Sequence, residues 1–199
     1  VAFWYWKKNK WIPIISVLTL FGMGFQAWLG KTVVDSNLAP YKITIHMVMA
    51  LLIVAFILYL IFAAKTNYKP QTYQKRFYTI LLFALALSLM QIILGTQVRQ
   101  FVDEQTKLLG YQKSLWLASP ELNFYIHRST SILVLALNGY LWYLNKVHSL
   151  GFNKLKLVIY CVILEAATGI LMYYFDFPFL SQPLHLVIAS ILFGIQCYI

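Results

Sequence analysis

The sequence predicts an all-α integral membrane protein, and three observations carry that prediction. Of its 199 residues, 61% are hydrophobic, above the share of about 45–50% that is typical of soluble domains. The mean hydropathy is +0.70. Six apolar runs are each near the length of about 20 residues that a helix needs to cross the hydrocarbon core. Helices are required there because lipid offers the backbone no hydrogen-bond partners.

The six predicted transmembrane helices follow one another along almost the whole chain. Lys7, Lys8 and Lys10 before the first run imitate a signal peptide, but that run is as long as a full span and leads into further spans, so no cleavable signal is predicted. Aromatic pairs such as Tyr173-Tyr174 gather near the run ends, where rings with a polar group settle. The runs are Trp11–Gly30, Ala39–Ala64, Phe77–Val98, Leu122–Leu144, Leu155–Phe175 and Pro183 onward.

An internal repeat with an offset of 139 residues relates the first two runs to the last two. The general likeness of apolar helices would explain matched Ala and Val residues, but it explains less well a polar residue, a Gly and a His kept in register. The repeat predicts eight helices in two parallel four-helix halves. Residues 1–64 would form the second hairpin of the N-terminal half, whose first hairpin would precede Val1, and residues 65–199 the C-terminal half. The matched pairs include Gln26 with Glu165, Gly30 with Gly169, and His46 with His185.

Charge predicts the orientation of the chain. Sixteen Lys and Arg against six Asp and Glu give a net charge of +10, and most of the basic residues sit between apolar runs. They therefore indicate membrane orientation, not nucleic-acid binding. With the basic loops inside, His46, His127 and His185 share one outer layer, whereas His148 is a solvated inner-loop residue. The inner basic residues are Lys7, Lys8, Lys10, Lys65, Lys69, Lys75, Arg76, Lys146, Lys154 and Lys156.

The histidines are the candidate functional residues, because ionisable side chains inside a membrane are costly. One such histidine is often only a hydrogen-bonded packing residue, but three at one depth favour a site. His127 and His185 lie on two helices of one four-helix group, where facing side chains clasp cofactors. Two imidazoles suit axial ligation of haem iron. Zinc is less suitable without further ligands at the right spacing. Cys161 and Cys197 lie in apolar runs and are expected to be packing residues.

A polar residue followed four positions later by Gly appears in three of the runs. Glycine at these positions lets a neighbouring helix or a flat macrocycle approach the backbone, although helix packing alone is an alternative. Arg99 and Arg128 are candidates for binding haem propionates through bidentate contacts, with snorkelling to the interface as the alternative. The longest outer connection, Gln100–Pro120, is a candidate cap over the outer site or a partner surface. The three elements are Gln26/Gly30, Gln91/Gly95 and Glu165/Gly169.

These residues resemble the haem A synthase family of the cytochrome oxidase assembly pathway. The likeness rests on GKTVVDSNLAPYKITIHMVMALL around His46, QIILGTQVRQ from Gln91, Tyr125-Ile126-His127-Arg128, and PLHLVIAS around His185. It spans nearly all of the chain. The resemblance implies eight helices in two halves and oxidation of a methyl group of haem O to the formyl group of haem A. It also implies that the protein lies in a bacterial inner membrane with its haem sites near the outer face.

By position, the resemblance implies that His127 and His185 ligate a resident haem b, and that His46 belongs to the site that binds haem O. The partner histidine of His46, the family's catalytic glutamate and the outer-loop cysteines would precede Val1. Glu121 is not assigned that catalytic role, because it lies in the other half. Expected partners are the lipid bilayer, haem O synthase and cytochrome oxidase assembly proteins, with no nucleic acid. A diheme cytochrome that only transfers electrons and a transporter remain alternatives.

Overall fold

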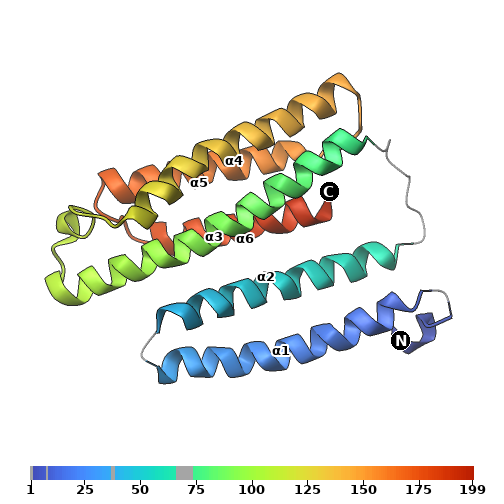
Figure 1. The fold of residues 1–199 in the computed structure, drawn as a ribbon, viewed down its shortest axis with the longest axis horizontal. Helices are drawn as coiled ribbons and strands as arrows, with labels where there is room; N and C mark the ends of the chain where they lie inside the picture. The colour runs from blue at the N-terminus through green and yellow to red at the C-terminus, as the bar shows by residue number, and fades with distance from the viewer. Residues whose placement is uncertain (1, 8, 37–38, 66–73) are drawn as a thin grey trace. The chain divides into compact units, whose positions relative to one another are not determined.

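The structure, a computed structural model, describes residues 2–7, 9–36, 39–65 and 74–199 (Figure 1). Lys8 and Lys69, two of the predicted inner basic residues, lie outside these ranges. Within them the chain forms helices and connections with no strand, so the predicted all-α class is confirmed. Two short 3₁₀ helices occur, η1 at Ala2–Tyr5 and η2 at Lys113–Leu115. The α-helices are α1 Trp11–Asp35, α2 Pro40–Ala63, α3 Lys75–Leu109, α4 Leu122–Val147, α5 Leu155–Tyr174 and α6 Ser181–Tyr198.

Among the described helices, four are long and apolar enough to cross a membrane: α1, α2, α3 and α5. Their outward side chains suit lipid, since Leu82 and Phe83 of α3 are each 66% exposed. α4 and α6 interrupt their apolar stretches with polar side chains, among them the two histidines described below. That these two helices also span, and that a repeat builds eight helices, stay predictions.

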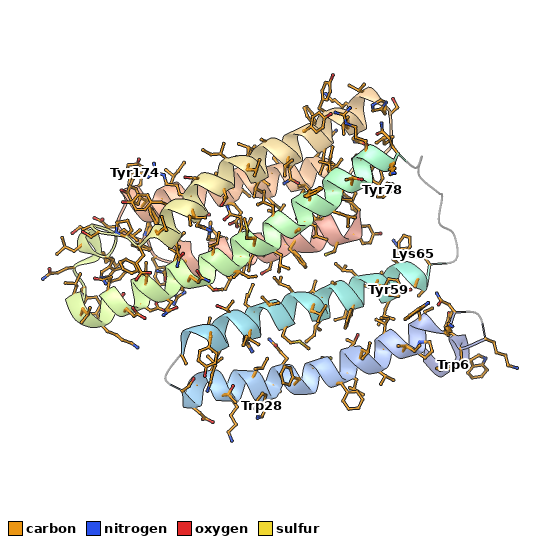
Figure 2. The ribbon with its side chains drawn as sticks, viewed as in Figure 1. Trp6, Trp28, Tyr59, Lys65, Tyr78 and Tyr174 are labelled. Atoms are coloured by element: carbon orange, nitrogen blue, oxygen red, sulfur yellow. The ribbon has the colours of Figure 1, made fainter. Side chains whose placement is uncertain are left out.

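Contacts divide the chain into two compact units, one with α1 and α2 and one with α3–α6. In the first, α1 and α2 form a hairpin whose connection ends at Pro40, the first residue of α2, where a missing N–H costs nothing. In the second, the four helices enclose an apolar core (Figure 1). Tyr78 lies in the first turn of α3 and Tyr174 ends α5, so aromatic rings occupy helix ends as expected (Figure 2).

One part of the predicted loop Gln100–Pro120 is helical, which corrects that prediction. α3 continues to Leu109 because this polar stretch carries side-chain pairs at the i, i+4 spacing. Arg99 Nε donates to Asp103 Oδ1 at 2.9 Å, and Gln100 Nε2 donates to Glu104 Oε1 at 2.9 Å. A prediction from hydropathy alone ends this helix too early, because hydropathy detects the membrane-crossing part of a helix and not a polar extension beyond it.

The residues after α3 fold back against the turn between α5 and α6. Val102, Trp116 and Phe177 form a small buried cluster there. Trp116 Nε1 donates to the Gly110 carbonyl at 3.1 Å, and Lys113 Nζ donates to the Phe177 carbonyl at 3.1 Å. The connection is therefore a packed cover on this end of the α3–α6 bundle.

A buried amide pair ties α4 to α6 inside the bundle. Asn138 is 0% and Gln196 is 2% exposed. Gln196 Nε2 donates to Asn138 Oδ1 at 3.0 Å, and Asn138 Nδ2 donates to the Val134 carbonyl at 2.8 Å. Because neither amide reaches water, each needs the other, and the pair fixes the register of the two helices.

We expect Asn138→Ala to destabilise the bundle by about 1 kcal/mol, since it strands the buried Gln196 amide. Unfolding in mixed micelles by increasing SDS would measure this, in a double-mutant cycle with Gln196→Ala. Ser190→Ala is the control, because the Ser190 hydroxyl donates to the Leu186 carbonyl of its own helix in a solvent-exposed hydrogen bond. Additive effects of the two amide substitutions would contradict the coupling.

Candidate functional site

The imidazole rings of His127 and His185 face each other across the α3–α6 bundle. His127 lies near the start of α4 and His185 near the start of α6. Their ring centroids are 6.4 Å apart, and the planes are inclined by 73°. Both side chains are partly buried, with 24% of the His185 side chain exposed. Two helices that α5 separates in the sequence thus bring two imidazole rings to one place.

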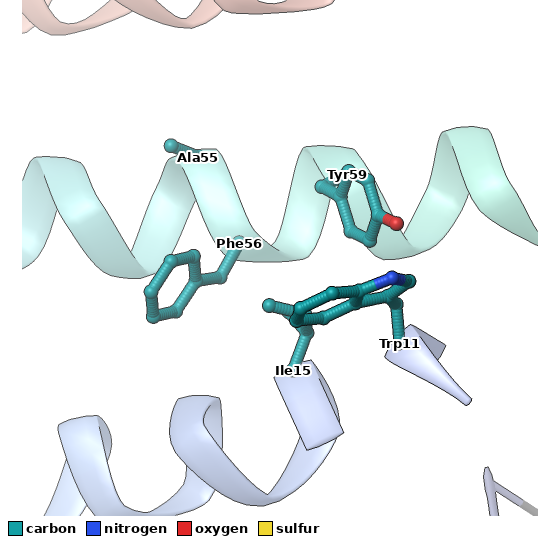
Figure 3. A pocket seen from close by; sticks show the side chains of 5 residues that line it. All are labelled: Trp11, Ile15, Ala55, Phe56 and Tyr59. Atoms are coloured by element: carbon teal, nitrogen blue, oxygen red, sulfur yellow. The ribbon is translucent and has the colours of Figure 1, made fainter. Parts of the chain in front are cut away.

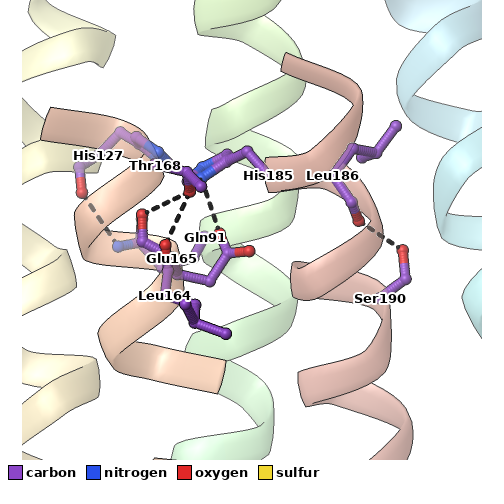
Figure 4. Close-up of polar contacts among 8 residues, drawn as sticks. All are labelled: Gln91, His127, Leu164, Glu165, Thr168, His185, Leu186 and Ser190. Atoms are coloured by element: carbon purple, nitrogen blue, oxygen red, sulfur yellow. Dashed lines mark hydrogen bonds and ion pairs between the residues drawn. The ribbon is translucent and has the colours of Figure 1, made fainter. Parts of the chain in front are cut away.

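The His127 backbone is held by a polar residue of the neighbouring helix α3. Gln91 Nε2 donates to the His127 carbonyl at 3.0 Å (Figure 4). Gln91 Oε1 accepts from the Thr130 hydroxyl at 3.1 Å. The amide of Gln91 is therefore used at both ends. The His127 ring gains nothing from this network, because its Nδ1 atom is buried without a hydrogen-bond partner.

The His185 ring, by contrast, is held directly by two side chains of α5. Its Nδ1 atom lies 3.0 Å from Glu165 Oε2 and 2.8 Å from Thr168 Oγ1 (Figure 4). Residues 165 and 168 are one turn apart on the same helix face, so both reach the ring. The Thr168 hydroxyl also lies 2.9 Å from the Leu164 carbonyl and 3.0 Å from the Glu165 carbonyl.

In the α1–α2 hairpin the neutral residue Gln26 holds the histidine, and it contacts the other ring nitrogen, Nε2. Gln26 Nε2 lies 3.1 Å from the His46 carbonyl and 3.2 Å from His46 Nε2. A carbonyl only accepts, so the atom facing both groups is the amide nitrogen, which donates to each. His46 Nε2 therefore accepts a hydrogen bond and carries the ring's lone pair.

Each of the three histidine rings rests against a glycine of the neighbouring helix. A Cβ added at Gly30 would lie 3.3 Å from His46 Cε1, and one added at Gly95 would lie 3.4 Å from His127 Cε1. At Gly169 the corresponding distance to His185 Cε1 is 3.9 Å. Glycine is used here for close approach and not for backbone conformation, because all three positions are helical.

Each of the hairpins α1–α2, α3–α4 and α5–α6 therefore has the same plan: a polar residue and a glycine of its first helix contact the histidine of its second helix. The sequence displays these elements separately, with the polar-x-x-x-Gly pattern on one helix and the histidine on the next. Thr168 and Thr130 were not predicted as part of the site. Their signal is weak, since a Thr that lies one turn from a polar residue is common in apolar helices.

A family model described as cytochrome oxidase assembly protein matches residues 1–197 of the chain. The chain belongs to this family. Among curated relatives, it is 26% identical over 206 residues to a heme A synthase from Ehrlichia canis (strain Jake), an alignment that covers 94% of this chain and 58% of the relative. It is 27% identical over 231 residues to a heme A synthase from Wolbachia pipientis subsp. Culex pipiens (strain wPip), covering 100% and 67%. The chain thus spans 58% and 67% of these relatives' lengths. No solved structure matches it significantly.

In this member of the cytochrome oxidase assembly family, the two predicted arginines have partners within the protein. Arg99 is paired with Asp103 at the polar end of α3, and 48% of its side chain is exposed. The Arg128 guanidinium lies 5.4 Å from the centre of the Tyr173 ring, a cation–π contact. His148 is exposed and caps the C-terminal end of α4, at the other end of that helix from His127.

The α1–α2 hairpin of this family member also has an apolar groove of about 370 Å³ (Figure 3). Trp11, Ile15, Ala55, Phe56 and Tyr59 line it. These residues belong to the N-terminal part of α1 and the C-terminal part of α2, whereas Gln26 and His46 lie toward the other helix ends. The groove is therefore separate from the histidine of that hairpin.

Proposed function

We propose that this chain is part of a haem A synthase, which oxidises a methyl group of haem O to the formyl group of haem A. Residues 65–199 would be its C-terminal four-helix half and residues 1–64 the second hairpin of its N-terminal half. His127 and His185 would hold a resident haem b, and His46 would face the substrate haem O. The observation that carries the proposal is the pair of facing imidazole rings.

The spacing of the two rings fits an iron atom between them. An imidazole nitrogen binds a metal at about 2 Å and lies about 1 Å from its ring centre, so two axial rings have centres about 6 Å apart. The centroids of His127 and His185 are 6.4 Å apart. In the described ranges, no three His, Cys, Asp or Glu side chains gather to hold a metal ion. Two imidazoles suit an iron that a macrocycle already ligates, whereas a bare zinc ion takes four ligands.

The chain's own residues would bind and orient the cofactor. His127 and His185 would supply axial nitrogens, and Gly95 and Gly169 leave room beside the rings. Arg99 and Arg128 are the cations nearest in sequence to the site and would reach propionates by releasing Asp103 and Tyr173. A bound haem b would supply one-electron redox chemistry. In the other hairpin, Gln26 would give up its hydrogen bond to His46 Nε2, and the lone pair of Nε2 would then be available to the substrate iron.

The fold and family support placing the protein in a membrane, and we infer a bacterial inner membrane with the histidine layer near the outer face. The proposed protein partners are haem O synthase and cytochrome oxidase assembly proteins, which would supply haem O and receive haem A. The basic residues of the inner loops support this orientation.

A product assay tests the proposed function. Haems extracted from cells that lack the protein should contain haem O and no haem A, and return of the intact protein should restore haem A. Continued conversion without it would contradict the proposal. A normal reduced-minus-oxidised haem spectrum together with that result would instead favour a cytochrome that only transfers electrons.

We expect Gly95→Val to lower haem bound by the purified protein by about tenfold, because a branched side chain there would press on the His127 ring. Haem per protein, from the pyridine haemochrome spectrum, measures this. Gly139→Val is the matched control on α4, since a Cβ at Gly139 meets nothing within 4 Å. Equal losses in both variants would mean that the effect is general to the helices and not to the ring.

A further inference from the structure

The two candidate axial histidines differ in what holds their second ring nitrogen. His185 Nδ1 contacts Glu165 and Thr168, whereas His127 Nδ1 is buried without a partner.

The Thr168 hydroxyl has one hydrogen, and two carbonyls of its own helix can accept it. The hydroxyl oxygen lies 2.9 Å and 3.0 Å from the carbonyls of Leu164 and Glu165, which only accept. With its hydrogen donated to one of these carbonyls, the hydroxyl oxygen is left to accept from His185 Nδ1 at 2.8 Å. In that arrangement Nδ1 of His185 carries the ring hydrogen.

Glu165 reinforces the same tautomer. Its Oε2 atom lies 3.0 Å from the same Nδ1, and 16% of the Glu165 side chain is exposed, so little water competes for the contact. In its carboxylate form Glu165 only accepts, which places the hydrogen on Nδ1. The lone pair of the His185 ring is then on Nε2, which is the atom free to bind a metal.

A carboxylate that accepts from one ring nitrogen makes the other nitrogen a more basic ligand. We propose, on the basis of the function proposed above, that Glu165 and Thr168 are positioning residues for His185. They fix the tautomer with Nε2 free, and they make His185 the stronger electron donor of an unequal axial pair. A stronger donor stabilises Fe(III) relative to Fe(II), so the pair lowers the reduction potential of the second-half haem.

The corresponding residues of the other two hairpins are neutral, so a carboxylate beside a histidine ring occurs in this layer only on α5 among the described helices. Gln26, which matches Glu165 at the offset of 139, places a neutral amide at His46, and Gln91 donates only to the His127 backbone. The substitution Glu165→Gln therefore converts the second-half residue to the one that the α1–α2 hairpin already uses. This makes it a conservative test, because an amide of the same shape is already accommodated beside a histidine in this chain.

The test is a redox titration of the haem in the intact protein, purified in detergent, with dithionite as reductant and the visible spectrum as readout. Each Fe(III) takes one electron from the titrant, and no bond is made or broken. We expect Glu165→Gln to raise the midpoint potential, with every tenfold loss of preference for Fe(III) appearing as about 59 mV. Thr168→Val should raise it by less, since it removes a neutral acceptor.

Thr79→Val is the matched control, because the Thr79 hydroxyl bonds the Lys75 carbonyl of its own helix, at the end of α3 that lies away from Gln91. Its potential should equal that of the parent. An unchanged potential in Glu165→Gln with haem retained would overturn the inference. If Glu165→Gln loses its haem, Thr168→Val decides, and an unchanged potential there overturns it equally. A parent protein with no haem on His127 and His185 would instead refute the proposed function.

Discussion

His127→Ala and His185→Ala are each expected to abolish haem binding in the α3–α6 bundle. A bis-histidine site loses one of its two ligands in either variant, and one ring of the His127–His185 pair cannot replace the other. The amount of haem bound per protein should therefore fall by the amount that this site holds. The low-spin bands that this haem contributes to the reduced-minus-oxidised spectrum should disappear.

His148→Ala is the control for this pair. His148 is exposed at the C-terminal end of α4, far along the helix from His127, so its removal should leave both haem content and spectrum unchanged. Added imidazole should restore part of the spectrum in the two ligand variants, since a free ring can enter the space left by alanine. Equal haem loss in all three variants would mean that depth in the membrane does not select the ligands.

Much of the fold was predictable because the membrane imposes a simple rule on the sequence. Runs of apolar residues long enough to span must be helical, and the predicted starts of the helices at Trp11, Leu122 and Leu155 coincide with the observed ones. The end of α3 was not predictable from hydropathy. Past Val98 the helix is held by polar i, i+4 pairs and by Val102 packing on Trp116 and Phe177, which are tertiary contacts.

The candidate site was predictable only in part, for a physical reason. A histidine inside an apolar run is conspicuous, because an ionisable group there needs a partner. The identity of that partner is not conspicuous, because it depends on how neighbouring helices are rotated against each other. The pairing of Glu165 and Thr168 with His185, and of Gln26 with His46, is therefore a result of helix packing that the sequence does not state.

The contacts of the two candidate arginines also depend on helix packing and could not be predicted from the sequence. Sequence position near the histidine layer made Arg99 and Arg128 candidates for propionate binding. In the structure the first is paired with Asp103, and the second lies over Tyr173. Both contacts are at the surface and cost little to exchange, since exposed ion pairs contribute about 0–1 kcal/mol. Their proposed role is therefore compatible with these contacts, but it depends on a ligand strong enough to replace them.

His46→Ala is expected to stop formation of haem A while the haem of the α3–α6 bundle remains. The reason is that His46 belongs to the α1–α2 unit, and its ring contacts Gln26 and lies against Gly30, with no part in the His127–His185 pair. The rate of conversion of haem O to haem A should fall by more than about 100-fold, the upper end of the effect that is typical when a residue supporting a ligand is replaced. Extracted haems give the ratio of haem O to haem A, and the reduced-minus-oxidised spectrum reports the second site in the same cells.

Gln26→Leu separates the ligand from its support. It removes the amide that donates to His46 Nε2 but keeps the imidazole, so conversion should fall less than in His46→Ala. If His46→Ala left the ratio of haem O to haem A unchanged, the α1–α2 hairpin would have no role in the reaction. If it removed both haem A and the spectrum of the second site, the two histidine sites would not be independent, and the assignment of one substrate site and one resident site would be wrong.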